Sequence, residues 1–232
     1  MNPKECVSVV HNRLLQIYGS PQWGDPLSAI DQLISTILSQ NTNDKNRDRA
    51  FEALRQRFPT WEEVRDAGES EVVEAIRPAG LANRKGPRIQ NILRHITDQY
   101  GELNLDFLTK MSAEEARQWL MALVGVGPKT TAIVLQFSLG KPAFPVDTHI
   151  YRVSRRLGLL PNKMNVEQAH QHLAQLLPID AYYPAHLNLI RLGREVCHAR
   201  RPNCLHCPLS DLCVYYAQNI DVSEKEMTKM GI

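Results

Sequence analysis

The sequence has little of what marks secreted, membrane or strongly charged proteins. No apolar run is long enough to span a bilayer, and the N-terminal residues resemble neither a signal peptide nor an arginine-rich leader. The 27 basic and 25 acidic residues leave a net charge of only +2, so a nucleic-acid surface would need local clustering of basic side chains. We therefore expect a soluble, cytoplasmic protein without a membrane partner.

The sequence also lacks strand-like alternation, internal repeats and low-complexity tracts. Apolar residues instead recur with helical spacing, most clearly over residues 27–38. Capping-box patterns begin at Thr60, Ser112 and Asn165, and Asp25 followed by proline predicts a further helix start. The predicted fold is all-α.

A chain of 232 residues can form one large domain or two small ones. Glycine and proline cluster near residues 19–24 and 140–145, which are candidate breaks. If the N-terminal helix packs with the C-terminal third, the middle of the chain is a domain inserted into another. The division we expect has a helical domain at 23–140, a second domain at 1–22 and 141–216, and a polar tail at 217–232.

The segment from Leu123 to Pro128 has the features of a helix-hairpin-helix. A helix ends at Leu123, Gly125 and Gly127 permit a tight turn, and Pro128 occupies the first position of the next helix. The backbone N–H groups of Gly125, Val126 and Gly127 would point outward beside a positive helix N-terminus. Such a turn can hold a phosphate without using a side chain.

Two charged residues near this hairpin are candidates for chemistry. Lys129 falls in the first turn of a helix, where the macrodipole disfavours an ammonium, so it is a candidate amine nucleophile. Asp147 follows Pro145 and precedes a helical run at 150–160, which predicts an N-cap. Its carboxylate could stabilise a developing cation or take a proton from the lysine. The alternative is a solvated lysine and a simple cap.

Cysteines are unevenly distributed, with one near the start and four crowded near the end. In a reducing compartment this crowding favours a metal centre over disulfides. The loops between the four contain six, two and five residues, a compact run that suits a four-thiolate [4Fe-4S] cluster better than two separated zinc knuckles. Zinc and uncoordinated thiols remain the alternatives. The candidate ligands are Cys197, Cys204, Cys207 and Cys213.

Basic residues offer possible contacts with a DNA backbone. Arg200 and Arg201 lie in the first loop of the cysteine run and could meet phosphates. A second group could form a basic stripe, or equally a solvated helix face. Its members are Arg84, Lys85, Arg88, Arg152, Arg155 and Arg156.

The hairpin, the segment from Val146 to His149 and the cysteine spacing together closely resemble the endonuclease III family of helix-hairpin-helix DNA glycosylases. The likeness runs from about Pro26 to Cys213. It implies a six-helix domain inserted into a cluster-bearing helical domain. It also implies a monomer associated with the nucleoid that binds double-stranded DNA containing a damaged base or an abasic site.

By this resemblance, Lys129 matches the family's Schiff-base lysine and Asp147 its essential aspartate. Gln40, after a one-residue shift, matches the glutamine that fills the gap left by an extruded base, and Leu81 matches the inserted wedge. The alternatives are a polar helix end for Gln40 and a loop residue folded onto the core for Leu81. The full set of expected DNA contacts is Gln40, Leu81, Gly125, Val126, Gly127, His149, Arg200 and Arg201.

The chain also departs from the family pattern. Val124 and Pro128 replace a usual proline and a commonly basic residue in the hairpin, and Ala82 and Arg84 replace a tyrosine and a serine of the wedge loop. These changes affect substrate preference more than reaction type. The predicted function is a bifunctional DNA glycosylase and abasic-site lyase of base excision repair that acts on oxidised or otherwise damaged pyrimidines. The alternatives are a monofunctional mismatch glycosylase for thymine, uracil or adenine, and a non-catalytic DNA-binding iron-sulfur protein.

Overall fold

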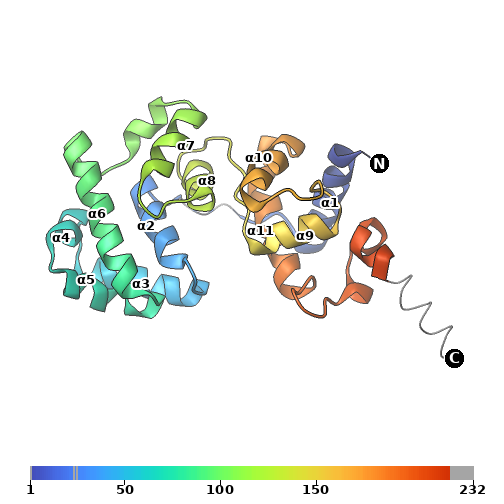
Figure 1. The fold of residues 1–232 in the computed structure, drawn as a ribbon, viewed down its shortest axis with the longest axis horizontal. Coiled ribbons are helices and arrows are strands. Elements are labelled where there is room, and N and C mark those ends of the chain that lie inside the picture. The colour runs from blue at the N-terminus through green and yellow to red at the C-terminus, as the bar shows by residue number, and fades with distance from the viewer. Residues whose placement is uncertain (1, 23, 25, 220–232) are drawn as a thin grey trace, which may run out of the picture. The chain divides into compact units, whose positions relative to one another are not determined.

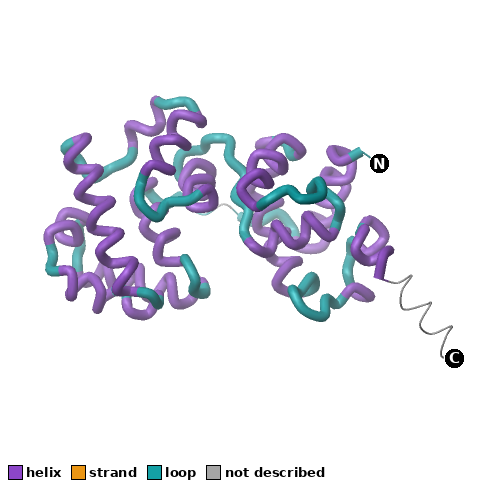
Figure 2. Tube along the Cα trace, viewed as in Figure 1, coloured by secondary structure: helices purple, strands orange, loops and turns teal. Residues whose placement is uncertain are grey.

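A computed structural model describes residues 2–22, 24 and 26–219. Within these residues every regular element is a helix, so the all-α prediction is confirmed (Figure 2). None of these helices has the length and apolar character needed to cross a membrane. The predicted polar tail at 217–232 falls outside the described residues from 220 onward, and residues 217–219 are helical.

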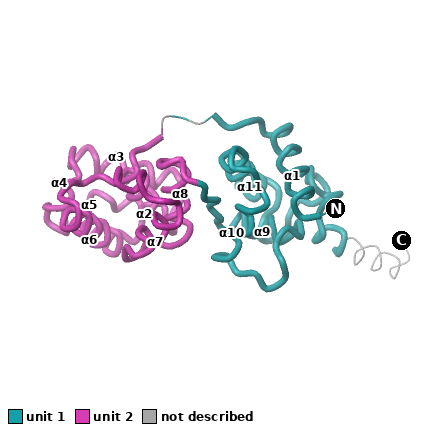
Figure 3. The backbone as a smooth tube through the Cα atoms, turned by 90° about the horizontal axis from the view of Figure 1, so that it is seen from above, with its two compact units in different colours: residues 1–24, 142–232 teal, residues 25–141 magenta. Residues whose placement is uncertain are grey.

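The chain forms two compact units (Figure 3). One comprises Met1–Gly24 and Pro142–Ile232, and the other comprises Asp25–Lys141. The second unit is therefore inserted between two segments of the first.

The inserted unit is built around α2 (Ala29–Ser39; Figure 1), in which all residues except Asp31, Gln32 and Ser39 are buried. Leu33, Ile34 and Ile37 are completely buried in it, each worth about 1.5–3 kcal/mol relative to exposure. The other elements are α3 (Asp44–Arg57), α4 (Trp61–Asp66), α5 (Glu69–Ala75), η1 (Arg77–Ala79), α6 (Ala82–Tyr100), η2 (Asp106–Lys110), α7 (Ala113–Ala122) and α8 (Pro128–Phe137).

The start of α2 differs from the sequence prediction. The helix begins at Ala29 rather than at Pro26, because Ser28 caps it by accepting a hydrogen bond from the backbone N–H of Asp31 at 3.2 Å. Asp25, the cap expected from the sequence, lies outside the described residues. The capping boxes at Thr60 and Ser112 are confirmed.

The other unit joins the two ends of the chain. Val7, Val10 and Leu14 of α1 (Pro3–Tyr18) share a buried core with residues of α9 (Thr148–Arg156) and α11 (Tyr182–Glu195). The remaining elements are α10 (Val166–Leu176), η3 (Ile179–Ala181), η4 (Cys204–His206) and η5 (Ser210–Leu212). The capping box at Asn165 opens α10 as expected.

Candidate functional site

The predicted hairpin joins α7 to α8 in the inserted unit. Leu123 caps the end of α7, Gly125 has a φ of +81°, and Pro128 is the first residue of α8. These features confirm the predicted helix-hairpin-helix geometry. The chain needs glycine at 125 because of this φ and because a Cβ there would lie 2.3 Å from Nε of Arg88.

The prediction that the backbone N–H of Val126 points outward to hold a phosphate is wrong. The backbone N–H of Val126 donates to the carbonyl of Leu123 at 3.1 Å, so it closes the turn instead of pointing outward. The Val126 side chain is buried as well. The N–H groups of Gly125 and Gly127 remain candidates, and a Cβ at Gly127 would meet no atom within 4 Å. The hairpin thus has open space at 127 for a ligand to approach the backbone.

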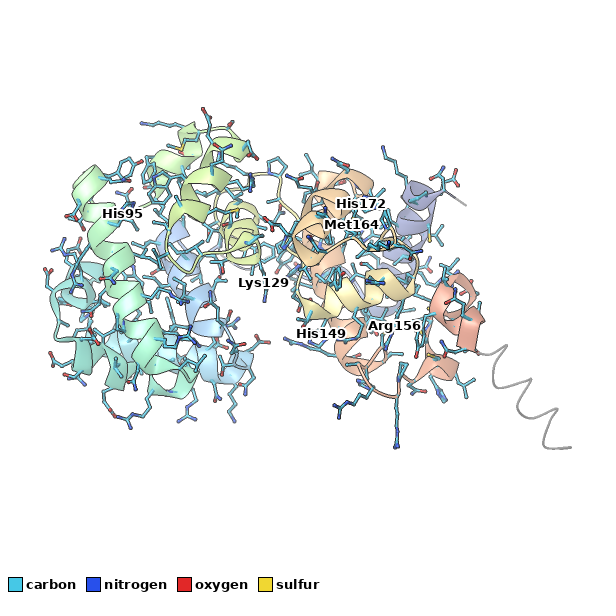
Figure 4. The ribbon with its side chains drawn as sticks, in the orientation of Figure 1. His95, Lys129, His149, Arg156, Met164 and His172 are labelled. Carbon is cyan, nitrogen blue, oxygen red and sulfur yellow. The ribbon has the colours of Figure 1, made fainter. Side chains whose placement is uncertain are left out.

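Lys129 is the second residue of α8 and is exposed (Figure 4). The seven residues that follow it, from Thr130 to Gln136, are all buried. The amine is therefore carried on a helix that the core holds in place. An exposed amine on a fixed backbone is accessible to an electrophilic carbon of a substrate.

Gln40 and Leu81 both lie in this unit. Gln40 caps the end of α2, but its side chain also reaches the hairpin, where Nε2 donates to the carbonyl of Gly125 at 3.2 Å. Its Oε1 accepts from Nη1 of Arg88 at 3.0 Å. Leu81 is 49% exposed and has a φ of +52°, immediately before α6. It is not folded onto the core.

Lys85 does not belong to a basic stripe. Its side chain is 2% exposed, and Nζ donates to the carbonyls of Leu38 at 2.7 Å and Ala79 at 2.9 Å. Burial lowers its pKa from 10.5 to about 8. Lys85 therefore ties the end of α2 to the turn before α6, and its ammonium is not available to DNA.

Asp147 lies in the other unit, where it is the N-cap of α9. Its Oδ1 accepts from the backbone N–H of Ile150 at 2.8 Å, so the predicted cap is confirmed. His149 is half-buried, with Nδ1 3.1 Å from Nη2 of Arg152. It packs against α11, since a Cβ on Gly193 would lie 2.8 Å from Cβ of His149.

Two arginines of the expected basic stripe instead hold the cysteine loop. Arg152 donates to the carbonyls of Cys197 at 2.9 Å and Gly193 at 2.8 Å. Arg156 donates to the carbonyl of His198 at 2.7 Å and to Sγ of Cys197 at 3.2 Å. Both guanidinium groups are engaged in these hydrogen bonds. The carbonyls of the cysteine loop need such donors because the loop folds against α9.

The four clustered cysteines line one cavity, together with Arg156 and Tyr215. Burial raises the pKa of the Cys207 and Cys213 thiols, so thiolates there need a cationic partner such as a metal centre. Within the described part of the chain, no three His, Cys, Asp or Glu side chains are arranged around a single metal ion. Four sulfurs around one cavity fit a cluster that carries a thiolate at each of four corners.

Arg200 and Arg201 are exposed on the same loop, so their side chains face solvent as a DNA contact requires. Sequence reasoning missed the supporting roles of Arg88, Arg152 and Arg156. Only their basic character was visible in the sequence, whereas their partners lie 41 to 48 residues away along the chain.

Two protein-family models match this chain. A family model described as "HhH-GPD superfamily base excision DNA repair protein" matches residues 34–178. A second, described as "Iron-sulfur binding domain of endonuclease III", matches residues 197–213. The first covers more than half of the chain, and the second spans all four clustered cysteines.

Individual proteins agree with these matches. Endonuclease III of Thermotoga maritima is 36% identical over 184 residues, covering 79% of this chain and 82% of that protein. An Arabidopsis thaliana relative is also 36% identical, over 167 residues, but the chain spans only 57% of its length. The solved structure of a non-covalent endonuclease III–DNA complex has a TM-score of 0.80 and 26% identity, covering 95% of this chain and 100% of that one.

Proposed function

This chain belongs to the HhH-GPD superfamily of base excision DNA repair proteins and, within it, to the endonuclease III family, and from this we propose that it is a bifunctional DNA glycosylase and abasic-site lyase. The resemblance predicted from the sequence is thereby confirmed, as are the DNA glycosylase class and the [4Fe-4S] cofactor. Cys197, Cys204, Cys207 and Cys213 would hold the cluster, whose role is to fix the fold of their loop.

The observation that carries the proposal is the exposed amine of Lys129, held in the first turn of α8 directly after the hairpin. A damaged base must leave the helical stack before its sugar can react. The Lys129 amine then attacks C1′, the bond from C1′ to the base breaks, and the base leaves with the bonding electron pair and a proton. The C1′–O4′ bond then breaks, O4′ takes a proton from solvent, and C1′ is left joined to Lys129 as a protonated imine.

The imine makes strand cleavage possible. It acidifies the proton on C2′, and loss of that proton expels the 3′ phosphate by β-elimination. Asp147 offsets the positive charge that develops on the sugar or accepts a proton from the amine. Its carboxylate is suited to this role because the hydrogen bond to the N–H of Ile150 fixes its orientation.

The proposed substrates are oxidised or otherwise damaged pyrimidines in double-stranded DNA, and the proposed active form is a monomer. A panel of duplexes, each with one lesion, would be scored separately for base release and for strand cleavage. Base release without cleavage would indicate the monofunctional alternative. DNA binding with neither product would indicate the non-catalytic one.

Borohydride trapping on an abasic-site duplex tests the lyase step. The wild-type protein should form a covalent adduct with the DNA, and Lys129→Gln should not. Lys110→Gln removes another exposed lysine from the same unit and should trap as the wild type does. The absence of a wild-type adduct, or an undiminished adduct in Lys129→Gln, would contradict the proposal.

A further inference from the structure

Asp147 is preceded by a buried segment that has no regular backbone pairing. Phe144 and Val146 are each 1% exposed, Pro145 is buried as well, and the segment lies outside every helix. Proline has no backbone N–H, and among the described residues no backbone-to-backbone hydrogen bond involves any of these three. Buried N–H and C=O groups need partners, so side chains must supply them here.

Two buried histidines provide these partners. Nδ1 of His170, in α10, lies 3.0 Å from the carbonyl oxygen of Phe144 and 3.2 Å from the backbone nitrogen of Val146. Nδ1 of His186, in α11, lies 3.0 Å from the carbonyl oxygen of Pro145. The two histidines are 8% and 4% exposed, so both contacts are sheltered from water. All of these residues belong to one compact unit.

The two rings hold the segment in different ways. A ring nitrogen either carries a hydrogen or accepts one, so Nδ1 of His170 serves the N–H of Val146 or the carbonyl of Phe144, but not both at once. A carbonyl only accepts, so Nδ1 of His186 must carry a hydrogen to bind Pro145. His186 therefore makes its contact in one defined proton state, two residues before the N-cap of α9.

The same face of α11 also holds the chain after Asp147. His186 and Gly193 are seven residues apart in α11, about two turns, and so lie on one face of this helix. The carbonyl of Gly193 accepts from Nη2 of Arg152 at 2.8 Å, and Gly193 packs against His149 in the first turn of α9. The backbone is thus fixed to α11 on both sides of Asp147.

Aromatic packing keeps the His186 ring in place. Phe144 makes a T-shaped contact with this ring, with centroids 6.3 Å apart, and a second with Tyr182 at 5.5 Å. The Tyr182 hydroxyl donates to the carbonyl of Ala174 in α10 at 2.6 Å. The two helices that carry the histidines are thereby tied to each other and to Phe144.

We propose that His186, assisted by His170, is a positioning residue for Asp147. The proposal rests on the proposed function, in which the Asp147 carboxylate stabilises the cationic sugar or accepts a proton from the amine. A misplacement of about 1 Å can slow such a step by about 10²-fold, so contacts that set the start of α9 also set the rate. Neither histidine needs to touch the substrate, because both act through the backbone before Asp147.

Asparagine and glutamine at position 186 test the contact while keeping a polar side chain. Asparagine carries its amide as far from the backbone as Nδ1, whereas glutamine carries it one bond further out, near the position of Nε2. His186→Gln should therefore slow single-turnover base release from a thymine glycol duplex by about ten-fold or more. His186→Asn should keep most of the wild-type rate. Affinity for a duplex with a tetrahydrofuran abasic analogue should be unchanged in both, because the effect lies in the chemical step.

A second variant removes the contact from the other helix. Both contacts of His170 pass through Nδ1, so His170→Gln should also slow base release without weakening binding to the tetrahydrofuran duplex. The test therefore does not depend on the folding of a single variant. A thermal midpoint and an iron content close to those of the wild type show that each variant is folded.

A double-mutant cycle shows whether His186 acts through Asp147. In an Asp147→Asn background, His186→Gln should cause no further slowing, because the carboxylate that it positions is already absent. His172→Asn is the matched control (Figure 4). Nε2 of His172 lies 3.1 Å from the carbonyl of Leu159, so this change removes a histidine-to-carbonyl contact from α10 without touching the segment before Asp147. Its base release should equal that of the wild type.

Amide hydrogen exchange gives a readout that needs no catalysis. The N–H of Ile150 donates to Asp147, so it should exchange several-fold faster in His186→Gln than in the wild type. The N–H of Leu14, in α1 of the same unit, should show no such change.

A wild-type rate of base release in His186→Gln would overturn the proposal, as would equal slowing by this substitution with and without Asp147→Asn. Unchanged exchange at Ile150 would overturn it too. Failure of the proposed function is distinct, because the wild type would then release no base from any lesion and form no borohydride adduct. The exchange at Ile150 would still report whether His186 holds Asp147 in place.

Discussion

The carboxylate of Asp147 accepts a hydrogen bond from the backbone N–H of Ile150 at 2.8 Å. The residue proposed to assist base removal is thus also the N-cap of α9. An N-cap needs a side-chain oxygen but no charge, whereas stabilising a cationic sugar needs the charge. The two roles can therefore be separated by substitution.

Asp147→Asn should retain the cap and lose the charge. Because asparagine caps helices as well as aspartate does, its free energy of unfolding should stay within about 0.5 kcal/mol of the wild type. Base excision should slow by about 10²-fold or more under single-turnover conditions. Asp147→Ala should in addition lose about 1 kcal/mol of stability. Full activity in the asparagine variant would remove Asp147 from the chemistry.

Gly125 and Gly127 should respond differently to alanine. At Gly125 the positive φ and the contact with Arg88 oppose a Cβ, so Gly125→Ala should lower the thermal midpoint and disturb the turn. At Gly127 the φ is −104° and no atom lies within 4 Å of a Cβ, so Gly127→Ala should fold normally. Gly127→Ala should nevertheless bind every DNA sequence more weakly, because phosphate contacts carry no base information. Unchanged affinity would mean that a phosphate does not approach at 127.

Leu81 combines exposure with an unfavourable backbone conformation. Its φ of +52° costs on the order of 1 kcal/mol for a residue with a Cβ. Leu81→Gly should therefore leave stability unchanged or raise it, while removing the apolar wedge that fills the stack. We expect slower base excision from duplex DNA but little change on a single-stranded abasic substrate, which has no stack to open. Equal losses on both substrates would argue against a wedge.

The features predicted correctly from the sequence are those set by residues close together in the chain. The capping boxes at Thr60, Ser112 and Asn165 each join residues three positions apart, as does the cap at Asp147. Pro128 opens α8 through its own fixed φ. These local rules, together with the cysteine spacing, were sufficient for the fold class and for the cofactor.

The features that the sequence did not reveal depend on distant partners. From the sequence, Lys85 is expected to be a solvated basic residue. In the fold, however, its ammonium donates to the carbonyl of Leu38, 47 residues earlier. Arg156 similarly reads as part of a DNA-facing stripe until the cysteine loop folds against α9. Periodicity specifies which face of a helix is polar, but it does not specify which segment covers that face.

Substitution of a cysteine that lines the cavity should remove the cluster, whereas substitution of Cys6 should not. Cys204→Ser replaces a thiol with a hydroxyl that stays protonated at neutral pH, so it should lose the visible absorbance of the iron-sulfur centre and the bound iron. Cys6→Ser is the matched control, because Cys6 packs against the apolar core and does not line the cavity. Its iron and sulfide content per chain should equal that of the wild type. Full iron content in Cys204→Ser would exclude Cys204 as a ligand.

Lys85 predicts a pH dependence of stability. Its pKa is about 8 in the folded chain, against an ordinary value of 10.5. Below pH 8 the amine is protonated in both states, and the folded state bears the cost of a buried charge. Between about pH 8 and 10.5 the unfolded chain binds more protons than the folded one, so this group makes stability rise with pH, by at most about 1.4 kcal/mol per pH unit.

Lys85→Met lacks this titration and leaves the carbonyls of Leu38 and Ala79 without their donor. The wild type should therefore gain stability relative to the variant as the pH is raised from 8 to 10. Denaturant unfolding at each pH, followed by the fluorescence of Trp61 and Trp119 in the same unit, measures the difference. Lys110→Met removes an exposed lysine, so its difference from the wild type should stay constant across the series. A constant difference between the wild type and Lys85→Met would mean that the Lys85 ammonium keeps its proton in the folded protein across this pH range. The carbonyls of Leu38 and Ala79 would then compensate for the cost of burying the charge.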